Sequence, residues 1–185
     1  MKKNTEIYDF IYNIYENYEE VLEFLIPHVE SVAKLAVKIA KNHKKADVDF
    51  VERAALLHDI GILKTHAPKI KCFGEAPYIQ HGIFGKAILE NNGFTRESIV
   101  AQTHIGVGIT AKHIIKNNLP LPPIDMCPTT LEEKIVSYAD LFYSKKPKYL
   151  TTPKTIEEVK ASVKKYGEDS YEVFKKWHKK FGEDM

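Results

Sequence analysis

Residues 51–61 read VERAALLHDIG, an apolar run with helical spacing that ends in an adjacent histidine and aspartate. Either Asp47 or Asp49 can cap this helix at its start, and the final glycine is a suitable stop. A polar pair at the end of a buried stripe needs partners that satisfy its hydrogen-bonding groups. His58 and Asp59 are therefore the first candidates for a functional site.

The chain outside this stretch also has helical periodicity almost throughout, which predicts an all-α, single-domain helical bundle. Upstream, we expect one helix over residues 7–25 that stops at Pro27, and a second, opened by that proline, over residues 29–40. Residues 62–77 contain Pro68, Gly74 and Pro77, and read as an irregular segment. The remaining helices are expected at 80–91, 95–104 (capped by Thr95), 110–117, 130–142 and 171–181, with capping boxes at Thr130/Glu133 and Thr155/Glu158.

Length and composition favour one ordinary globular domain over residues 1–185, because 185 residues with 44% apolar and 28% charged content leave little room for a second. The formal net charge of +2 is too small for the broad positive field that nucleic-acid polymers attract. The apolar runs are far shorter than a membrane span and the first residues lack a signal peptide, so we expect a cytoplasmic protein without a membrane partner. A homo-oligomer remains open. The isolated Cys72 and Cys127 support neither a disulfide framework nor a metal knuckle.

Most of the histidines fall at the ends of the expected helices. If successive helices run out and back, a residue that opens one helix and a residue that closes the next arrive at the same end of the bundle. The separations between the pairs are long enough for helical hairpins with short loops. Six residues are thereby expected at one end: His28 and His81 open helices, His58, Asp59 and His104 close them, and Asp140 lies in the last turns of the 130–142 helix.

Four imidazoles and two carboxylates gathered in one place are costly without a cation. The mixed nitrogen and oxygen donors suit Fe, Mn or Zn better than Ca or Mg, with Fe or Mn preferred. Six ligands exceed what one catalytic ion needs, so we expect two divalent ions bridged by a carboxylate and a water or hydroxide, with Asp59 as the bridging candidate. For any one of these histidines alone, a helix cap or a solvated side chain is the commoner role.

The segments PHVESVAKLA, VERAALLHDIG and EEKIVSYADLF together resemble the H…HD…D signature of the HD superfamily of metal-dependent phosphohydrolases, with an HD-type helical bundle. QHGIFGKAIL and QTHIGVGIT resemble the subgroup with two further histidines, as in dinuclear HD enzymes, and the overall pattern is similar to small stand-alone HDIG-domain proteins. The resemblance covers about residues 22–145, with the helices of 155–182 packed on this core. The signature positions are His28, His58, Asp59 and Asp140, and the added histidines are His81 and His104.

The resemblance implies hydrolysis of a phosphate ester or phosphoanhydride by a metal-activated hydroxide, on a small nucleotide-like metabolite. No GYP-type extension is present, so cyclic-di-GMP hydrolysis is not supported. The lysine that often directly follows HDIG is also absent, because two residues intervene before Lys64. The candidate catalytic residues are Asp59 and Lys64, and the candidate substrate-binding residues are Lys64, His66, Gly106 and Lys145.

The irregular segment Ile62–Pro77 is interpreted as a substrate-selecting lid, because it follows His58 and Asp59 and precedes His81. In the alternative interpretation, Ile70, Phe73 and Tyr78 simply pin this loop to the helices.

Two other functions stay open at this point. Some members of the superfamily use a similar six-ligand set in mixed-valent di-iron oxygenases. A nucleotide-sensing regulatory domain is the non-enzymatic alternative, although such domains need not keep the full ligand set.

Overall fold

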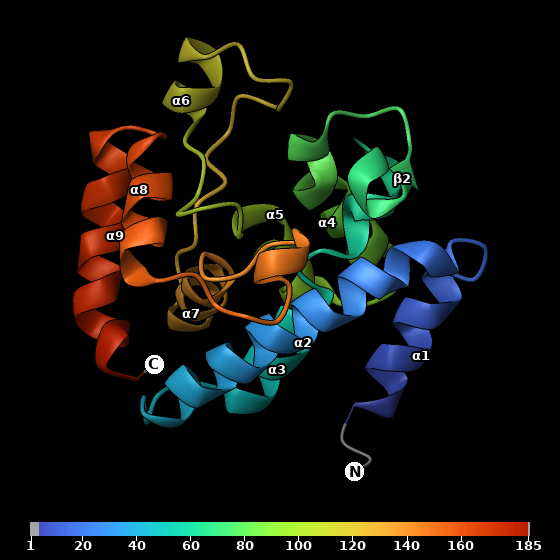
Figure 1. Cartoon of the computed structure of the whole chain (residues 1–185), viewed down its shortest axis with the longest axis horizontal. Helices are drawn as coiled ribbons and strands as arrows, with labels where there is room; N and C mark the ends of the chain where they lie inside the picture. Colours follow the sequence, from blue (N-terminus) through green and yellow to red (C-terminus); the bar gives the residue numbers. More distant parts are fainter. Residues whose placement is uncertain (1–3, 185) are drawn as a thin grey trace.

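The structure is a computed structural model that describes residues 4–184, and it confirms the expected all-α bundle (Figure 1). The described residues also include a hairpin of two-residue strands, β1 (His66–Ala67) and β2 (Cys72–Phe73), paired antiparallel. The helices are α1 (Thr5–Ile14), α2 (Glu19–Lys41), α3 (Val48–Leu57), α4 (His81–Asn91), α5 (Thr95–Thr103), α6 (Ala111–Lys116), α7 (Leu131–Asp140), α8 (Ile156–Lys164) and α9 (Glu168–Phe181).

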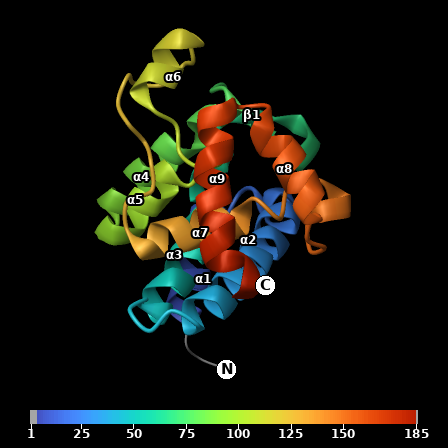
Figure 2. The same ribbon diagram turned by 90° about the vertical axis from the view of Figure 1, so that its left-hand side faces the viewer.

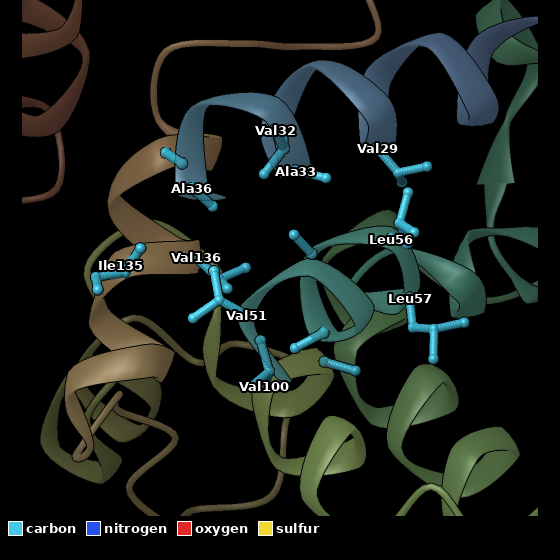
Figure 3. Packing of buried hydrophobic residues seen from close by; sticks show 14 of the residues in the cluster. Val29, Val32, Ala33, Ala36, Val51, Leu56, Leu57, Val100, Ile135 and Val136 are labelled. Carbon is cyan, nitrogen blue, oxygen red and sulfur yellow. The ribbon is translucent and has the colours of Figure 1, made fainter. Parts of the chain in front are cut away.

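The core lies where α2, α3, α5 and α7 meet (Figure 3). Val29, Val32 and Ala36 recur along one face of α2 at helical spacing and are fully buried. They face apolar side chains of α3 and α7, among them Val51 and Val136. The four helices thus form one continuous apolar interior, and the ends of α3, α5 and α7 are fixed relative to the middle of α2.

The C-terminal helix α9 covers α7 on the side away from α3, and α8 packs against α9 (Figure 2). Phe174 and Phe181 of α9 pack on the ring of Tyr138, with ring centroids 6.1 and 5.4 Å apart. The hydroxyl of Tyr138 lies 2.7 Å from Nδ1 of His178. The aromatic face of α9 therefore closes the core over the helix that carries Asp140.

The prediction that Pro27 separates two helices is wrong. The chain instead turns at residues 15–18, and Pro27 lies inside the 23-residue helix α2. Tyr15 at this turn is fully buried and donates its hydroxyl to the carbonyl of Ile60 at 2.9 Å. This contact and the apolar face of α2 outweigh the one helical hydrogen bond that a proline removes. His28 therefore lies mid-helix and does not open a helix.

The segment Ile62–Pro77 is more ordered than expected, and part of it belongs to the core. Residues Ile60–Lys64 form a 3₁₀ turn, and the β1–β2 hairpin follows. Ile62 and Cys72 are 0% and 1% exposed and Ile70 is 8% exposed, whereas Phe73 is 69% exposed. Ile70 therefore pins the loop as the alternative interpretation proposed, while Phe73 does not.

Several helix ends differ from expectation by a few residues. The helix of the 51–61 stretch ends at Leu57, with His58 as its C-cap, and α5 has Phe94 as its N-cap without a side-chain capping bond. The capping box of Thr155 and Glu158 is present. Thr130 caps α7 by accepting from the backbone N–H of Glu133, and α9 begins at Glu168 rather than near residue 171.

A small second apolar cluster lies outside the main core, around α6. It consists of the buried residues Ile114, Leu121 and Met126 with partly buried neighbours. Figures 1 and 2 show α6 and the long connection to α7 projecting from the bundle. Among residues 4–184, no helix is both long enough and apolar enough to cross a membrane.

Candidate metal centre

The fold brings the six histidine and aspartate candidates together. His58 and Asp59 follow the last residue of α3, His104 follows the last residue of α5, and Asp140 is the last residue of α7. His81 is the first residue of α4, and His28 points inward from the middle of α2. Five of the six are at most 5% exposed, and Asp140 is the most open at 21%.

One group of donors consists of His28, His58, Asp59 and Asp140. Nε2 of His28 lies 3.0 Å from Oδ2 of Asp59 and 3.1 Å from Oδ1 of Asp140. Nε2 of His58 lies 3.0 and 3.5 Å from the same two oxygens. Four donor atoms from three helices therefore face a common point.

A second group consists of His81, His104 and the other oxygen of Asp59. Oδ1 of Asp59 lies 3.4 Å from Nε2 of His81 and 3.7 Å from Nε2 of His104. The two imidazole Nε2 atoms are 3.1 Å apart. Asp59 thus belongs to both groups, and each of its carboxylate oxygens faces one of them.

These groups fit a pair of transition-metal ions. Adjacent ligands about 2.1 Å from one ion lie about 3 Å from each other, which is the spacing observed in the first group. Four buried atoms have no partner in hydrogen-bonding geometry within the described chain, and three of them face the common points: Nε2 of His28, Nε2 of His58 and Oδ1 of Asp59. Buried polar atoms without partners are costly, and cations at these points would satisfy them.

Three of the imidazoles are oriented by backbone carbonyls three residues earlier in the chain. Nδ1 of His58 lies 2.6 Å from the carbonyl of Ala55, Nδ1 of His81 lies 2.7 Å from that of Tyr78, and Nδ1 of His104 lies 2.9 Å from that of Ala101. A proton held on Nδ1 by such a bond leaves the lone pair of Nε2 free for a cation. These carbonyls were not predicted from the sequence, and the signal that could have found them is the position of each histidine at a helix end.

Neighbouring charges in the cluster determine which of its side chains carry a proton. Burial opposes a charge on His58, but Asp59 and Asp140 outweigh it and raise the pKa of His58 to about 10. Burial lowers the pKa of His104 to about 3, with the imidazoles of His58 and His81 adding to the effect. The pKa values of Asp59 and Asp140 lie well below their usual range, because neighbouring cationic groups outweigh burial. The metal-free cluster therefore holds protons that a cation would have to displace.

Lys145 also reaches the cluster, from the loop that follows α7. Its ammonium contacts Oδ2 of Asp59, and its side chain is 11% exposed. The ammonium is 5.9 Å from the centre of the ring of Tyr78, which lies 4.7 Å from the ring of His81. Among the four residues expected to bind substrate, Lys145 is the one that contacts a candidate metal ligand within the described chain.

The other three substrate candidates lie apart from these contacts. Lys64 and His66 are exposed, and within residues 4–184 their side chains make no hydrogen bond or ion pair. Gly106 has a φ of +63° and open space on the side where a Cβ would lie. It follows His104 by two residues, so its backbone is open to approach near the second donor group.

A close backbone approach sets the distance between the two donor groups. A Cβ on Gly61 would lie 2.2 Å from the carbonyl oxygen of His81 and 2.3 Å from the nitrogen of Gly85. Only a residue without a side chain permits the 3₁₀ turn after Asp59 to lie against the first turn of α4. The glycine of the HDIG sequence thereby holds Asp59 within reach of His81.

Residues 25–144 match the HD domain family, a span that includes all six clustered residues. The chain belongs to the HD domain family. A structural relative of this HD domain is the HD domain of the phosphodiesterase PgpH from L. monocytogenes, known from a crystal structure. It aligns with a TM-score of 0.54 and 16% identity over 91% of this chain and 94% of that one. At this identity the likeness shows the shared fold.

Three sequence relatives are archaeal. An uncharacterized protein of Methanocaldococcus jannaschii is 40% identical over 123 residues, which are 66% of this chain and 65% of that protein. The tRNA (cytidine(56)-2'-O)-methyltransferase of Thermoplasma volcanium is 34% identical over 169 residues, or 88% of this chain and 44% of the relative. That of Picrophilus torridus is 36% identical over 66% of this chain and 32% of the relative. The part of each relative that this chain matches is therefore less than two thirds of that relative's length.

Proposed function

We propose that this HD domain is a metal-dependent phosphohydrolase that cleaves a phosphate ester or phosphoanhydride of a small, nucleotide-like metabolite. The observation that carries the proposal is the position of Asp59, whose two oxygens each face a separate group of imidazole donors. A carboxylate shared in this way is the arrangement of a two-ion site. Its mixed nitrogen and oxygen donors favour Fe or Mn, with Zn as the alternative.

Two divalent ions would supply Lewis acidity at the phosphoryl oxygens and would acidify a water molecule. Around these two ions, the residues of the chain would have separate roles. Asp59 and Asp140 supply negative charge, and the Nδ1-to-carbonyl bonds hold the imidazoles of His58, His81 and His104 in place. Lys145 brings a positive charge to the edge of the cluster, where it would bind a phosphoryl oxygen of the substrate.

The other substrate contacts are proposed from the places that three residues take in the chain near the donor groups. Gly106 would allow a phosphate close to its backbone, and Lys64 and His66 would meet the non-reacting part of the substrate from the segment between the two donor groups. The shared fold with a domain described as a phosphodiesterase supports phosphate-ester chemistry. Methyl transfer to tRNA is not carried over, because the matched part makes up less than half of either methyltransferase.

The test starts from protein purified without added metal and then loaded with Mn²⁺ or Fe²⁺. The loaded protein is assayed on p-nitrophenyl phosphate, bis(p-nitrophenyl) phosphate, nucleotides and dinucleoside polyphosphates. We expect metal-dependent release of a phosphate group that is lost in His58→Ala. His113→Ala serves as the matched control, because this histidine lies on α6 outside the cluster and should leave turnover unchanged.

Two outcomes would redirect the assignment. Iron-loaded protein that consumes O₂ with a substrate while leaving its phosphate groups intact would support the di-iron oxygenase instead. Nucleotide binding without turnover by any loaded form would support a sensing domain.

A further inference from the structure

The ammonium of Lys145 contacts a carboxylate oxygen that one of the cations would need. It contacts Oδ2 of Asp59, the oxygen that lies 3.0 Å from Nε2 of both His28 and His58. That oxygen is therefore the one that faces the first donor group. A cation held by this group and the ammonium of Lys145 would share a single carboxylate oxygen.

Burial makes this sharing unfavourable. Asp59 is 1% exposed and the side chain of Lys145 is 11% exposed, so little water screens one charge from the other. Without a metal ion, the ammonium neutralises Asp59 and forms a paired buried charge. With an ion in the first group, the same ammonium would face a divalent cation at short range.

The side chain has a route away from Asp59. Its ammonium already lies 5.9 Å from the centre of the ring of Tyr78, and this tyrosine is 36% exposed. A cation is attracted to the face of an aromatic ring, so Tyr78 offers a second position towards solvent. The side chain of Lys145 can therefore change position while the six candidate metal ligands stay in place.

The backbone that carries Lys145 is fixed. Lys154 donates from its ammonium to the carbonyls of Leu141 at 2.9 Å and Tyr143 at 2.7 Å, and its N–H donates to the carbonyl of Phe142. The N–H of Ser144 donates to the carbonyl of Tyr149 at 3.0 Å. A displacement of the ammonium is therefore a movement of the side chain and not of the loop.

We infer that Lys145 is an internal counter-cation, which neutralises Asp59 in the metal-free protein, is displaced when the first donor group binds a metal ion, and then presents its ammonium beside Tyr78 to an anionic substrate. This inference rests on the proposed metal centre, but it does not require that the reaction is phosphate hydrolysis. It couples metal binding to substrate binding, because each favours the displaced position of the same side chain.

The first experiment measures Mn²⁺ affinity without substrate, by titration of the metal-free protein. In Lys145→Met no ammonium has to be displaced, so we expect Mn²⁺ to bind at least about tenfold more tightly than to the wild type, with unchanged stoichiometry. The melting temperature of the metal-free variant should fall by roughly 5 °C or more, because Asp59 loses its buried partner. Lys146→Met is the matched control, since the exposed Lys146 is the next residue and should change neither quantity.

The second experiment uses the wild-type chain and does not depend on the folding of a variant. Brief acetylation with acetic anhydride, read by peptide mass spectrometry, reports how accessible each lysine is. In the metal-free protein Lys145 should react several-fold more slowly than Lys146. Saturation with Mn²⁺ should raise the rate at Lys145 several-fold and leave that at Lys146 unchanged.

The outcomes separate this inference from the proposed function. Unchanged or weaker Mn²⁺ binding by Lys145→Met, or acetylation of Lys145 that does not respond to metal, would overturn the counter-cation role even if the protein hydrolyses phosphates. Wild-type protein that binds no Mn²⁺, Fe²⁺ or Zn²⁺ would remove the metal centre itself. Tight Mn²⁺ binding with the expected lysine response but without phosphohydrolase activity would retain the counter-cation and reject the proposed reaction.

Discussion

Asp59 contributes to both donor groups, whereas each histidine contributes to one. Its Oδ2 faces His28 and His58, and its Oδ1 faces His81 and His104. Removing its charge should therefore weaken both metal positions, while removing one imidazole of the second group should weaken only that group.

The stoichiometry of bound metal tests this difference. We expect wild-type protein to hold two Mn²⁺ ions per chain after dialysis, His104→Ala about one, and Asp59→Asn fewer than one, measured by elemental analysis. His113→Ala should retain two. Full metal content in His104→Ala would assign His104 to structure or substrate contact, and two ions in Asp59→Asn would refute the bridging role.

The six clustered residues could be chosen from the sequence because they are expected as a set to converge at helix ends and they match the H…HD…D pattern, whereas one such histidine alone is a weak signal. The reason given for His28 was nevertheless wrong, since this residue lies inside α2 and not at a helix start. It reaches the site because it shares the buried face of α2 with Val29, Val32 and Leu25. The contact of Lys145 with Asp59 joins residues 86 positions apart, and no local pattern encodes such a contact.

At the scale of elements, the contact between the Ile60–Lys64 3₁₀ turn and α4 determines how the two donor groups meet. Gly61→Ala should separate these elements, because the added methyl would overlap the backbone at His81 and Gly85. Overpacking of this kind typically costs about 1–3 kcal/mol. Denaturant unfolding of the metal-free protein should show this loss, and affinity for the second metal ion should fall.

A change at an exposed apolar position provides the control for Gly61→Ala. Ile99→Ala on α5 alters a side chain that is 41% exposed, and it should change stability by less than about 0.5 kcal/mol. Wild-type stability and metal affinity in Gly61→Ala would show that the turn and α4 can separate without consequence.

The segment between the two donor groups remains a candidate for substrate selection through its exposed side chains. Lys64→Ala and His66→Ala should raise KM for the preferred phosphate substrate while leaving two Mn²⁺ ions bound, because neither side chain contacts a ligand within the described residues. Steady-state kinetics checks the expected KM, and metal analysis of the same samples checks the number of bound Mn²⁺ ions. Wild-type kinetics in both variants would place selectivity elsewhere.

The helices were predictable as elements, but two boundaries depended on tertiary contacts. Pro27 reads as a break, yet the chain turns earlier because Tyr15 is buried and bonded to Ile60. The irregular segment Ile62–Pro77 reads as a lid outside the core, yet Ile62 and Cys72 are buried within it and β1 pairs with β2. Local propensity assigns neither feature, because both depend on residues far away in the sequence.

At the scale of the whole molecule, buried histidines make the stability of the metal-free protein depend on pH. The pKa of His58 is raised to about 10, so its contribution is fully present below pH 6.5 and is lost as the pH rises towards 10. The pKa of His104 is lowered to about 3, so the unfolded chain binds an extra proton and stability falls as the pH drops from 6.5 towards 3. We expect the highest melting temperature near pH 6.5.

Metal loading should flatten this profile on its alkaline side. Mn²⁺ requires His58 in its neutral form, so the decline between pH 6.5 and 10 should flatten in the loaded protein. Differential scanning fluorimetry with EDTA or with Mn²⁺ gives the two profiles. Parallel profiles over the alkaline range would show that His58 does not exchange its proton for metal.

The ligands are also spread unevenly over the bundle. They come from α2, α4 and the ends of α3, α5 and α7, whereas α6, α8 and α9 hold none of the six. Bound cations would therefore act as a non-covalent cross-link between residues 28 and 140. In hydrogen-exchange experiments, metal should slow the amides of the five linked helices together, as one cooperative unit, and leave the local opening of α6 almost unchanged.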